Sequence, residues 1–332
     1  MDLEAFTKVF DGLPAFRLRQ AKEAVFQHLI DNWEQAKVLP QDLRQKLASA
    51  CPLEIKGKFF IGHSSVKATL TLVDGAVIET VLLQHKSGRN TVCVSSQAGC
   101  AMACAFCATG EEGLTRNLTA GEIVAQVLVM ARWLKENHQE KITNLVFMGM
   151  GEPLLNYRHV KEAINWLHDA EAFNLGWRHI SISTCGIVPN LRDLAKDFPQ
   201  INLAISLHAP NDELRSHLMP INMTYNLKTL LSAVDEHIAT AGREVMFEYT
   251  LIKGVNDSDA LAAQLAKLMK KKLYVVNLIS YNPTGKFAKT SEETLERFYE
   301  ILKQARVKVT KRSSLGEDVV GACGQLASRP FA

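Results

Sequence analysis

Three cysteines crowd into one short stretch of the chain, Cys100-Ala-Met-Ala-Cys104-Ala-Phe-Cys107. Thiolates spaced three and then two residues apart on one loop can hold three corners of a cubane iron–sulfur cluster, which normally takes four cysteine ligands. Because no fourth cysteine stands nearby, this pattern leaves one iron open to a substrate or cofactor. A structural zinc site is the alternative. Zinc, however, takes four ligands in closed pairs, and the sequence has no second C-x2-C or H-x3-H pair.

The bulk composition describes an ordinary globular protein. The 332 residues are 47% hydrophobic and 22% charged, enough for one large domain or two smaller ones. Seven cysteines, an odd number, fit a reducing compartment where thiols serve metals or catalysis. The net charge of +3 permits a nucleic-acid partner without indicating one. We see no signal-peptide pattern and no apolar run of membrane-spanning length, so we expect a cytoplasmic protein without membrane association.

The elements before the cysteines are of two kinds. Up to about Pro52, apolar residues at helical spacing and breaks at Pro14 and Pro40 predict three short helices. These helices carry basic residues on their expected exposed faces: Arg17, Arg19, Lys22, Arg44 and Lys46. Such charges are more often a solvated face than a phosphate-binding one. Residues 56–92 then alternate apolar and polar side chains around Asp74-Gly75, which predicts a small antiparallel insert with a hairpin turn.

From residue 91 onward the pattern alternates between strands and helices. Six apolar runs predict strands at residues 91–95, 144–148, 179–184, 201–207, 245–251 and 273–279. The intervening segments predict helices at 119–136, 157–170, 189–197, 226–240, 257–271 and 291–305, and Thr119 with Glu122 forms a capping box for the first. Six such units predict an α/β fold with a partly open parallel barrel, whose functional loops follow the carboxyl ends of the strands.

Several motifs together resemble one family. They are the run from Cys93 to Cys100, the cysteine loop with Ala108-Thr109-Gly110, Arg116 to Thr119, Met148 to Pro153, Ser181 to Pro189, Ser206 to Asp212 and Ala322 to Leu326. This set resembles the RlmN family of radical S-adenosylmethionine (SAM) enzymes, which methylate carbon 2 of adenosine in 23S ribosomal RNA and in tRNA. The sister family Cfr methylates carbon 8 on a similar scaffold, and Leu218 to Asn222 and Tyr281 to Pro283 look closer to Cfr.

The resemblance implies cofactors and residue roles. Cys100, Cys104 and Cys107 would hold one 4Fe-4S cluster, and two SAM molecules would be used per turnover. Cys323 would carry the methyl group, Glu79 would remove the adenine proton, and Cys93 would resolve the adduct by forming a disulfide. Contacts to SAM would come from Gly151, Glu152, Ser183, Ser206, Leu207, His208 and Asn282. Without the resemblance, Glu79 reads as a water-facing strand residue and His208 as a structural histidine.

The resemblance also implies a division of the chain and a set of partners. We expect a helical RNA-binding domain (1–55), an antiparallel adaptor (56–92), a partial (β/α)6 radical SAM barrel (93–312) and a C-terminal loop (313–332). Lys308, Lys311 and Arg312 would join the helices in contacting 23S rRNA or tRNA. The electron donor would be of flavodoxin or ferredoxin type, and the chain a monomer. A radical SAM enzyme that does not methylate, or a pure RNA-binding module, would have no use for Cys93 and Cys323.

Overall fold

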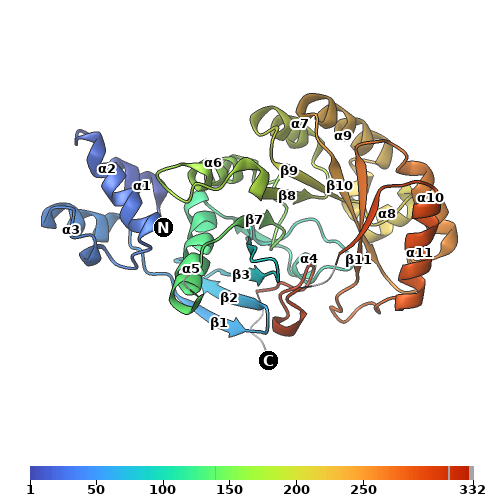
Figure 1. The fold of residues 1–332 in the computed structure, drawn as a ribbon, viewed down its shortest axis with the longest axis horizontal. Helices are drawn as coiled ribbons and strands as arrows, with labels where there is room; N and C mark the ends of the chain where they lie inside the picture. The colour runs from blue at the N-terminus through green and yellow to red at the C-terminus, as the bar shows by residue number, and fades with distance from the viewer. Residues whose placement is uncertain (139, 313–314, 329–332) are drawn as a thin grey trace.

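The N-terminal residues fold into the three predicted helices. A computed structural model describes residues 1–138, 140–312 and 315–328, and in it these helices form a lobe at one end of the molecule (Figure 1). They are α1 (Leu3–Lys8), α2 (Ala15–Lys22) and α3 (Gln41–Ala50), and α2 runs on into a π-helical turn at Glu23–Gln27. Trp33 joins them, since its ring stacks on Phe6 and its indole donates to the Cys51 carbonyl at 2.8 Å.

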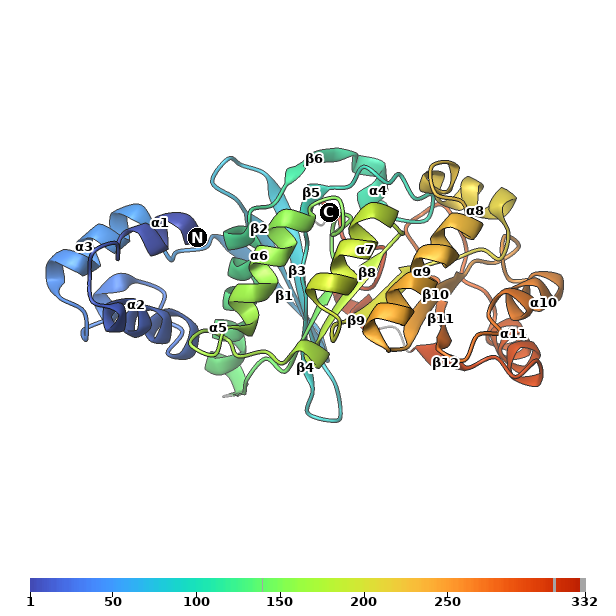
Figure 2. The same ribbon diagram turned by 90° about the horizontal axis from the view of Figure 1, so that it is seen from above.

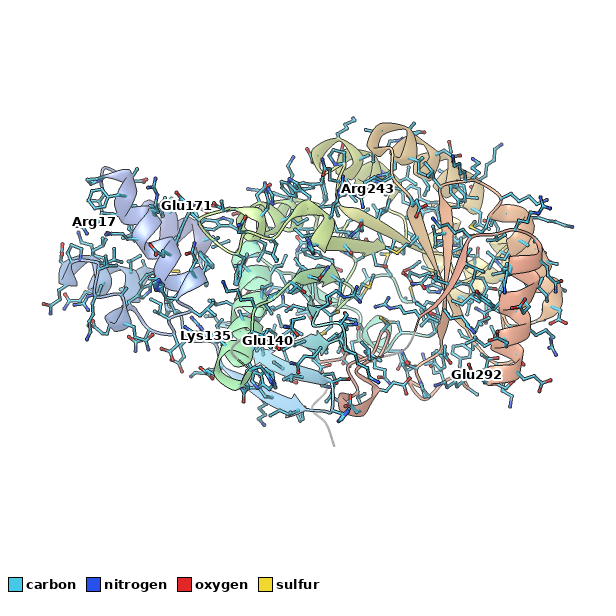
Figure 3. The ribbon with its side chains drawn as sticks, viewed as in Figure 1. Arg17, Lys135, Glu140, Glu171, Arg243 and Glu292 are labelled. Carbon is cyan, nitrogen blue, oxygen red and sulfur yellow. The ribbon has the colours of Figure 1, made fainter. Side chains whose placement is uncertain are left out.

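This lobe is anchored to two helices of the barrel, α5 (Ala120–His138) and α6 (Tyr157–His168). The Arg132 guanidinium on α5 donates to the carbonyls of Leu29, Ile30 and Leu53. Two basic residues that we expected on exposed faces also point toward the barrel. Lys22 lies 2.6 Å from Asp169, and Arg19 lies 2.9 Å from Glu171, the residue labelled beside the lobe in Figure 3. Their charges are therefore partly used inside the protein.

The antiparallel insert belongs to the same sheet as the barrel. Strands β1 (Gly57–Ile61), β2 (Ser65–Thr71) and β3 (Val77–Gln84) pair antiparallel, and β3 then pairs antiparallel with β4 (Asn90–Cys93). The predicted turn at Asp74-Gly75 joins β2 to β3, with Gly75 at φ +86°, a left-handed conformation that glycine adopts without strain. The insert thus extends the sheet and places Glu79, on β3, next to the barrel.

Beyond β4 the strands are parallel and follow one another in chain order. They are β7 (Asn144–Phe147), β8 (Ile180–Thr184), β9 (Asn202–Ser206), β10 (Val245–Leu251), β11 (Tyr274–Ser280) and β12 (Val309–Arg312). The first five extend the predicted barrel from β4. Strand β12 is an addition to the six predicted units, because two of its four residues are exposed, the other two are half-buried, and the segment is too polar to give a strand signal.

Helices cover the outside of the parallel strands (Figure 2). Besides α5 and α6, they are α7 (Val188–Asp197), α8 (Asp212–Leu218), α9 (Leu227–Ala241), α10 (Asp259–Leu268) and α11 (Glu292–Gln304). Their apolar residues recur at helical spacing; on α6, for example, the buried side chains are Val160, Ala163, Ile164 and Leu167. Side-chain caps begin several of them, and Thr119 and Glu122 form the predicted capping box of α5.

The cysteine loop lies between β4 and α5. It leaves a short hairpin, β5 (Gln97–Gly99) paired with β6 (Leu114–Asn117), and contains the one-turn helix α4 (Ala108–Glu112) directly after Cys107. The bulged pairing brings Gly99 close to the Gly113 carbonyl, where a Cβ atom would lie 1.9 Å from that oxygen. Gly99, at φ +74°, is therefore required to close the loop.

Candidate active site

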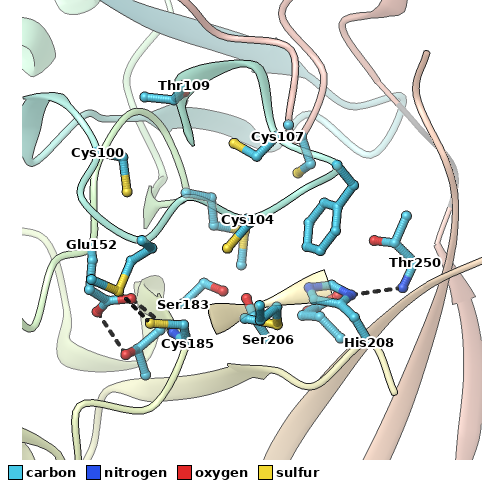
Figure 4. Close-up of a pocket in the computed structure, with 18 of the residues that line it drawn as sticks. Cys100, Cys104, Cys107, Thr109, Glu152, Ser183, Cys185, Ser206, His208 and Thr250 are labelled. Carbon is cyan, nitrogen blue, oxygen red and sulfur yellow. Dashed lines mark hydrogen bonds between the residues drawn. The ribbon is translucent and has the colours of Figure 1, made fainter. Parts of the chain in front are cut away.

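A pocket opens at the carboxyl ends of the barrel strands, beneath the cysteine loop (Figure 4). Cys100, Cys104 and Cys107 all line it, and the loops after β7, β8 and β9 supply the opposite wall. Most of the residues assigned from the resemblance meet here. Those on the pocket wall, besides the three cysteines, are Gly151, Glu152, Ser183, Ser206, His208 and Cys323.

Four other assigned residues do not line this pocket. Leu207 is buried in the core, and Cys93 and Glu79 lie on β4 and β3. Asn282 contacts the C-terminal segment instead, since its side-chain amide donates to the Cys323 carbonyl at 3.0 Å. The SAM contacts expected of Leu207 and Asn282 would therefore come from backbone atoms or through a neighbour.

The buried thiols of the cysteine loop are suited to a metal cluster. Burial raises the pKa of Cys100 to about 11, and burial also raises the pKa of Cys104 and of Cys107. Thiolates in this position need a positive partner, and bound metal ions deprotonate coordinating thiols. Among the described residues, no group of three His, Cys, Asp or Glu side chains is placed to hold a single metal ion. Three thiols on one pocket wall fit the three protein ligands of a 4Fe-4S cluster.

Glu152 is a buried carboxylate on the wall facing the cysteines. It accepts from the Leu154 and Cys185 amides at 2.9 and 2.8 Å and from the Thr184 hydroxyl at 2.7 Å. Burial raises its pKa, while the Cys185 amide and the Thr184 hydroxyl counteract this. The Cys185 thiol also bonds to this carboxylate, so its partners here are neutral donors and its negative charge would attract an ammonium group. Gly151 beside it, at φ +95°, makes room for Gln97, because a Cβ atom there would lie 2.5 Å from the Gln97 Cβ.

His208 is a neutral wall residue in a strained backbone conformation. Its φ is +55°, its Nδ1 accepts from the Thr250 amide at 3.0 Å, and its carbonyl accepts from Asn256. Burial lowers the pKa of His208 to about 3. The Phe106 ring of the cysteine loop meets it edge-on, with ring centroids 4.7 Å apart. A neutral, apolar-faced imidazole suits contact with the flat ring of a cofactor or base.

Cys323 reaches the pocket on a C-terminal segment that is bonded to α4. The Ala108 amide donates to the Gly324 carbonyl at 2.8 Å, and the Thr109 hydroxyl donates to the Leu326 carbonyl at 2.6 Å. The Ser328 amide donates to both Glu112 oxygens, at 2.9 and 3.0 Å. The helix that follows the third cysteine of the loop therefore holds the segment that presents an exposed Cys323.

The thiols of Cys93 and Cys323 are close enough to interact electrostatically, but they are not bonded. All seven cysteines are free, so the disulfide that the resemblance implied is not present. Burial, and then the charge of Cys323, raises the pKa of Cys93 to about 12. The Cys93 thiol is thus held protonated in this structure.

Comparison with known proteins places the chain in a family. The radical SAM superfamily profile matches residues 94–266, more than half of the chain. A probable dual-specificity RNA methyltransferase RlmN from Symbiobacterium thermophilum is 44% identical over 96% of this chain and 87% of its own length. The chain belongs to the RlmN family. A second such RlmN, from Carboxydothermus hydrogenoformans, is also 44% identical, over 96% of this chain and 93% of its own.

Structural comparison agrees with this assignment. The crystal structure of a radical SAM methyltransferase from Sphaerobacter thermophilus superposes with a TM-score of 0.93 at 44% identity, covering 98% of this chain and 96% of that one. The two proteins therefore share one fold over nearly their whole length. In the described part of the chain, no helix has the length and apolar character needed to cross a membrane.

Glu79, the RlmN-type base candidate, lies in a buried ion pair that the sequence pattern did not reveal. Its Oε1 is 2.8 Å from the Lys67 ammonium on β2, and both side chains are about 2% exposed. The Glu79 Oε2 accepts from the Ala327 amide at 3.1 Å, and Lys67 also donates to the Val320 carbonyl. Strand alternation suggested a water-facing residue, because the C-terminal segment that covers it is distant in sequence.

Arg312 differs from the expected basic patch. Lys308 and Lys311 are exposed and paired with Glu244 and Glu296, whereas Arg312 lines the pocket. Its guanidinium lies 4.0 Å from the Glu248 carboxylate, and the charges of Cys323, Glu248 and Cys93 raise its pKa. Arg312 therefore adds a positive charge to the RlmN-type pocket beside both cysteines. Its place on the unpredicted strand β12 explains why sequence reasoning put it elsewhere.

Proposed function

We propose that this protein methylates carbon 2 of adenosine in 23S rRNA and in tRNA, using SAM and one 4Fe-4S cluster. The observation that carries the proposal is the position of Cys323. An exposed thiol on the C-terminal segment lines the same pocket as Cys100, Cys104 and Cys107, so a methyl group carried on its sulfur would lie inside the cofactor pocket. A radical SAM enzyme that does not methylate has no need for such a thiol.

The cofactors would be held by opposite walls of the pocket. Cys100, Cys104 and Cys107 would bind the cluster, and the Glu152 carboxylate would receive the SAM ammonium group. Ser183, Ser206 and the neutral His208 would contact the rest of SAM. Once bound, the cluster and SAM would supply the electron, the methyl groups and the radical chemistry that the electron-poor carbon 2 of adenine requires.

The thiol chemistry would fall to Cys323 and Cys93. Cys323 would accept a methyl group as a reachable thiolate, and Arg312 would stabilise that charge. After the methyl carbon is joined to adenine, Glu79 would accept the ring proton. Cys93 would then attack the Cys323 sulfur and form a transient disulfide. The carbon released from that sulfur would keep the electron pair of the broken bond and take up a proton to become the methyl group. A reductant would return both cysteines to free thiols before the next turnover.

RNA would reach the pocket from the N-terminal lobe. We assign residues 1–55 to RNA binding, 56–92 to an adaptor, 93–312 to the barrel and 313–332 to the segment that carries Cys323; residues 313–314 and 329–332 of that segment lie outside the described part. The target adenosine must leave its stack to enter the pocket. A cytoplasmic monomer that receives electrons from a flavodoxin- or ferredoxin-type protein completes the proposal.

Mass spectrometry of RNA treated with the reconstituted enzyme, SAM and reductant tests the proposal. We expect 2-methyladenosine in both 23S rRNA and tRNA substrates. Cys323→Ala should form none, and Cys93→Ala should accumulate a covalent protein–RNA adduct through Cys323. Finding 8-methyladenosine would assign the chain to Cfr-type chemistry instead. Normal turnover by Cys323→Ala, or turnover by Cys93→Ala without an adduct, would rule out the two-thiol scheme.

A further inference from the structure

A buried arginine lies behind the pocket wall without an anionic partner at hydrogen-bonding distance. Arg215, on α8, is 0% exposed. Its guanidinium donates to neutral oxygens only, those of Asn222, Tyr225, Cys185 and Ser206. Among the described residues, the Arg215 Nε has no hydrogen-bond partner, and the guanidinium donates to no carboxylate.

The nearest carboxylate reaches Arg215 only through a neutral amide. The Asn222 side chain accepts from Arg215 at 2.9 Å and donates to Asp212 at 3.0 Å. Asp212 is exposed and also accepts from the Leu227 amide. Water therefore screens its charge, and this relay offsets little of the cost of burying a guanidinium. Charged groups in protein interiors are normally paired, because removal from water without a partner is costly.

The surroundings of Arg215 point to the missing anion. Two of its acceptors, the Cys185 and Ser206 carbonyls, belong to residues that line the cofactor pocket. The helix that carries it also contacts the cysteine loop, since the Ala105 amide donates to the Leu218 carbonyl at 2.9 Å. Ala105 adjoins Cys104, whose thiol interacts electrostatically with Arg215. Arg215 therefore lies close to the cysteine loop.

We propose that Arg215 is the built-in counter-charge of the iron–sulfur cluster and raises its reduction potential. The inference rests on the cluster assignment made above. The three thiolate ligands of the cluster are negatively charged, and one-electron reduction adds one more negative charge to the cluster. Net charge and nearby hydrogen bonding are among the factors that set cluster potentials. A buried cation beside Cys104 stabilises the reduced state more than the oxidised state.

Redox titration followed by electron paramagnetic resonance tests this role. Wild type, Arg215→Lys and Arg215→Met would be reconstituted anaerobically and reduced stepwise with dithionite and mediator dyes. For Arg215→Met we expect about a tenfold lower ratio of reduced to oxidised cluster at a fixed potential, which is a midpoint about 59 mV lower for a one-electron couple. Arg215→Lys, which keeps the charge, should stay within about threefold of wild type.

Two outcomes separate this inference from the cluster assignment. Equal midpoints for wild type and a fully loaded Arg215→Met would overturn the counter-charge role and leave the cluster assignment intact. A wild type that gives no cluster signal would overturn both.

Thermal unfolding with and without the cluster keeps the inference testable if Arg215→Met loads poorly. Without the cluster, Arg215→Met should unfold at or above the wild-type temperature, because the unpaired cation is gone. Loading should then raise the unfolding temperature of wild type more than that of the variant. An Arg215→Met protein that is markedly less stable than wild type already without the cluster would show that Arg215 is only a structural tie between strands, which would overturn the inference.

Discussion

At the scale of single residues, the three cysteines of the loop differ from Cys51 and Cys185 in their position and contacts. Cys100, Cys104 and Cys107 share a pocket wall, whereas Cys51 is enclosed by the N-terminal helices and accepts the Trp33 indole on its carbonyl. Cys185 lines the pocket too, but its sulfur contacts Met102 at 3.3 Å and its amide is held by Glu152. These contacts predict which thiols the cluster requires.

We expect Cys104→Ala to lose cluster binding, because two remaining thiolates cannot hold three corners of a cubane. Cys51→Ala and Cys185→Ala should keep the full iron and sulfide content. Anaerobic reconstitution, followed by iron and sulfide analysis and the visible absorption spectrum, measures this. A Cys104→Ala protein with a complete cluster that cleaves SAM would contradict the assignment.

The Lys67–Glu79 pair makes a second prediction at this scale. Lys67→Met leaves a carboxylate about 2% exposed without its cation, and breaking a buried pair from one side costs about 3–5 kcal/mol. Glu79→Gln in the same chain should recover most of this loss, because the amide oxygen and nitrogen can still bond to Thr69 and to the C-terminal segment. Denaturant unfolding followed by circular dichroism measures both. Single and double variants of equal stability would show that the pair is not coupled.

At the scale of elements, the sequence predicted most strands and helices of the barrel but not its last strand, β12. Strong amphipathic patterns, as on α6, and the Asp74-Gly75 turn depend on neighbours along the chain, so they could be read directly. Strand β12 could not be predicted, because its four residues are mostly polar and form a strand only by pairing with β11. The cysteine loop could be recognised from its spacing alone. The SAM contacts came only from the family resemblance.

The sequence also did not predict that two charged residues, Glu79 and Arg215, are buried. The water-facing interpretation of Glu79 was wrong, because the segment that covers it lies about 250 residues further along the chain. Arg215 gave no signal on its helix, since its place depends on where the ends of β8 and β9 meet α8. Long-range contacts of this kind leave no local pattern for sequence reasoning to detect.

The bonds between α4 and the C-terminal segment predict an element-scale effect. Thr109→Val removes the hydroxyl that donates to the Leu326 carbonyl, and the absence of a hydrogen bond of this kind costs about 1 kcal/mol. We expect faster proteolysis within residues 315–328 and faster alkylation of Cys323 in the cluster-free protein. Thr240→Val, which removes an exposed hydroxyl–carbonyl bond on α9, is the matched control. Equal rates in both variants would show that α4 does not hold the segment.

At the scale of the whole molecule, the proposed binding of RNA by the N-terminal lobe predicts a salt-dependent affinity. Lys37 and Lys46 are exposed on the lobe, and removing a lysine that neutralises one phosphate lowers the slope of affinity against salt by about one. We expect Lys37→Glu with Lys46→Glu to weaken tRNA binding several-fold at low salt and to flatten this slope.

Charge reversal is the sharper design here, because deleting the lobe would also remove the carbonyl partners of Arg132. Lys272→Glu, which reverses an exposed charge just before β11, is the control. Fluorescence anisotropy across a salt series measures both variants. If the lobe variant and the control bind tRNA alike, the lobe does not contact the RNA backbone.

The anchoring of the N-terminal lobe has a consequence for how a target is chosen. Arg132 fixes three carbonyls of the lobe to α5, and Lys22 fixes α2 to the end of α6. If the lobe grips a folded RNA, the separation between that grip and the cofactor pocket is set by the protein and not by the RNA. The protein then measures a fixed distance between the lobe and the pocket. It would select an adenosine by its distance from a rigid stem, so two RNAs with unrelated sequences but matching geometry could share one enzyme.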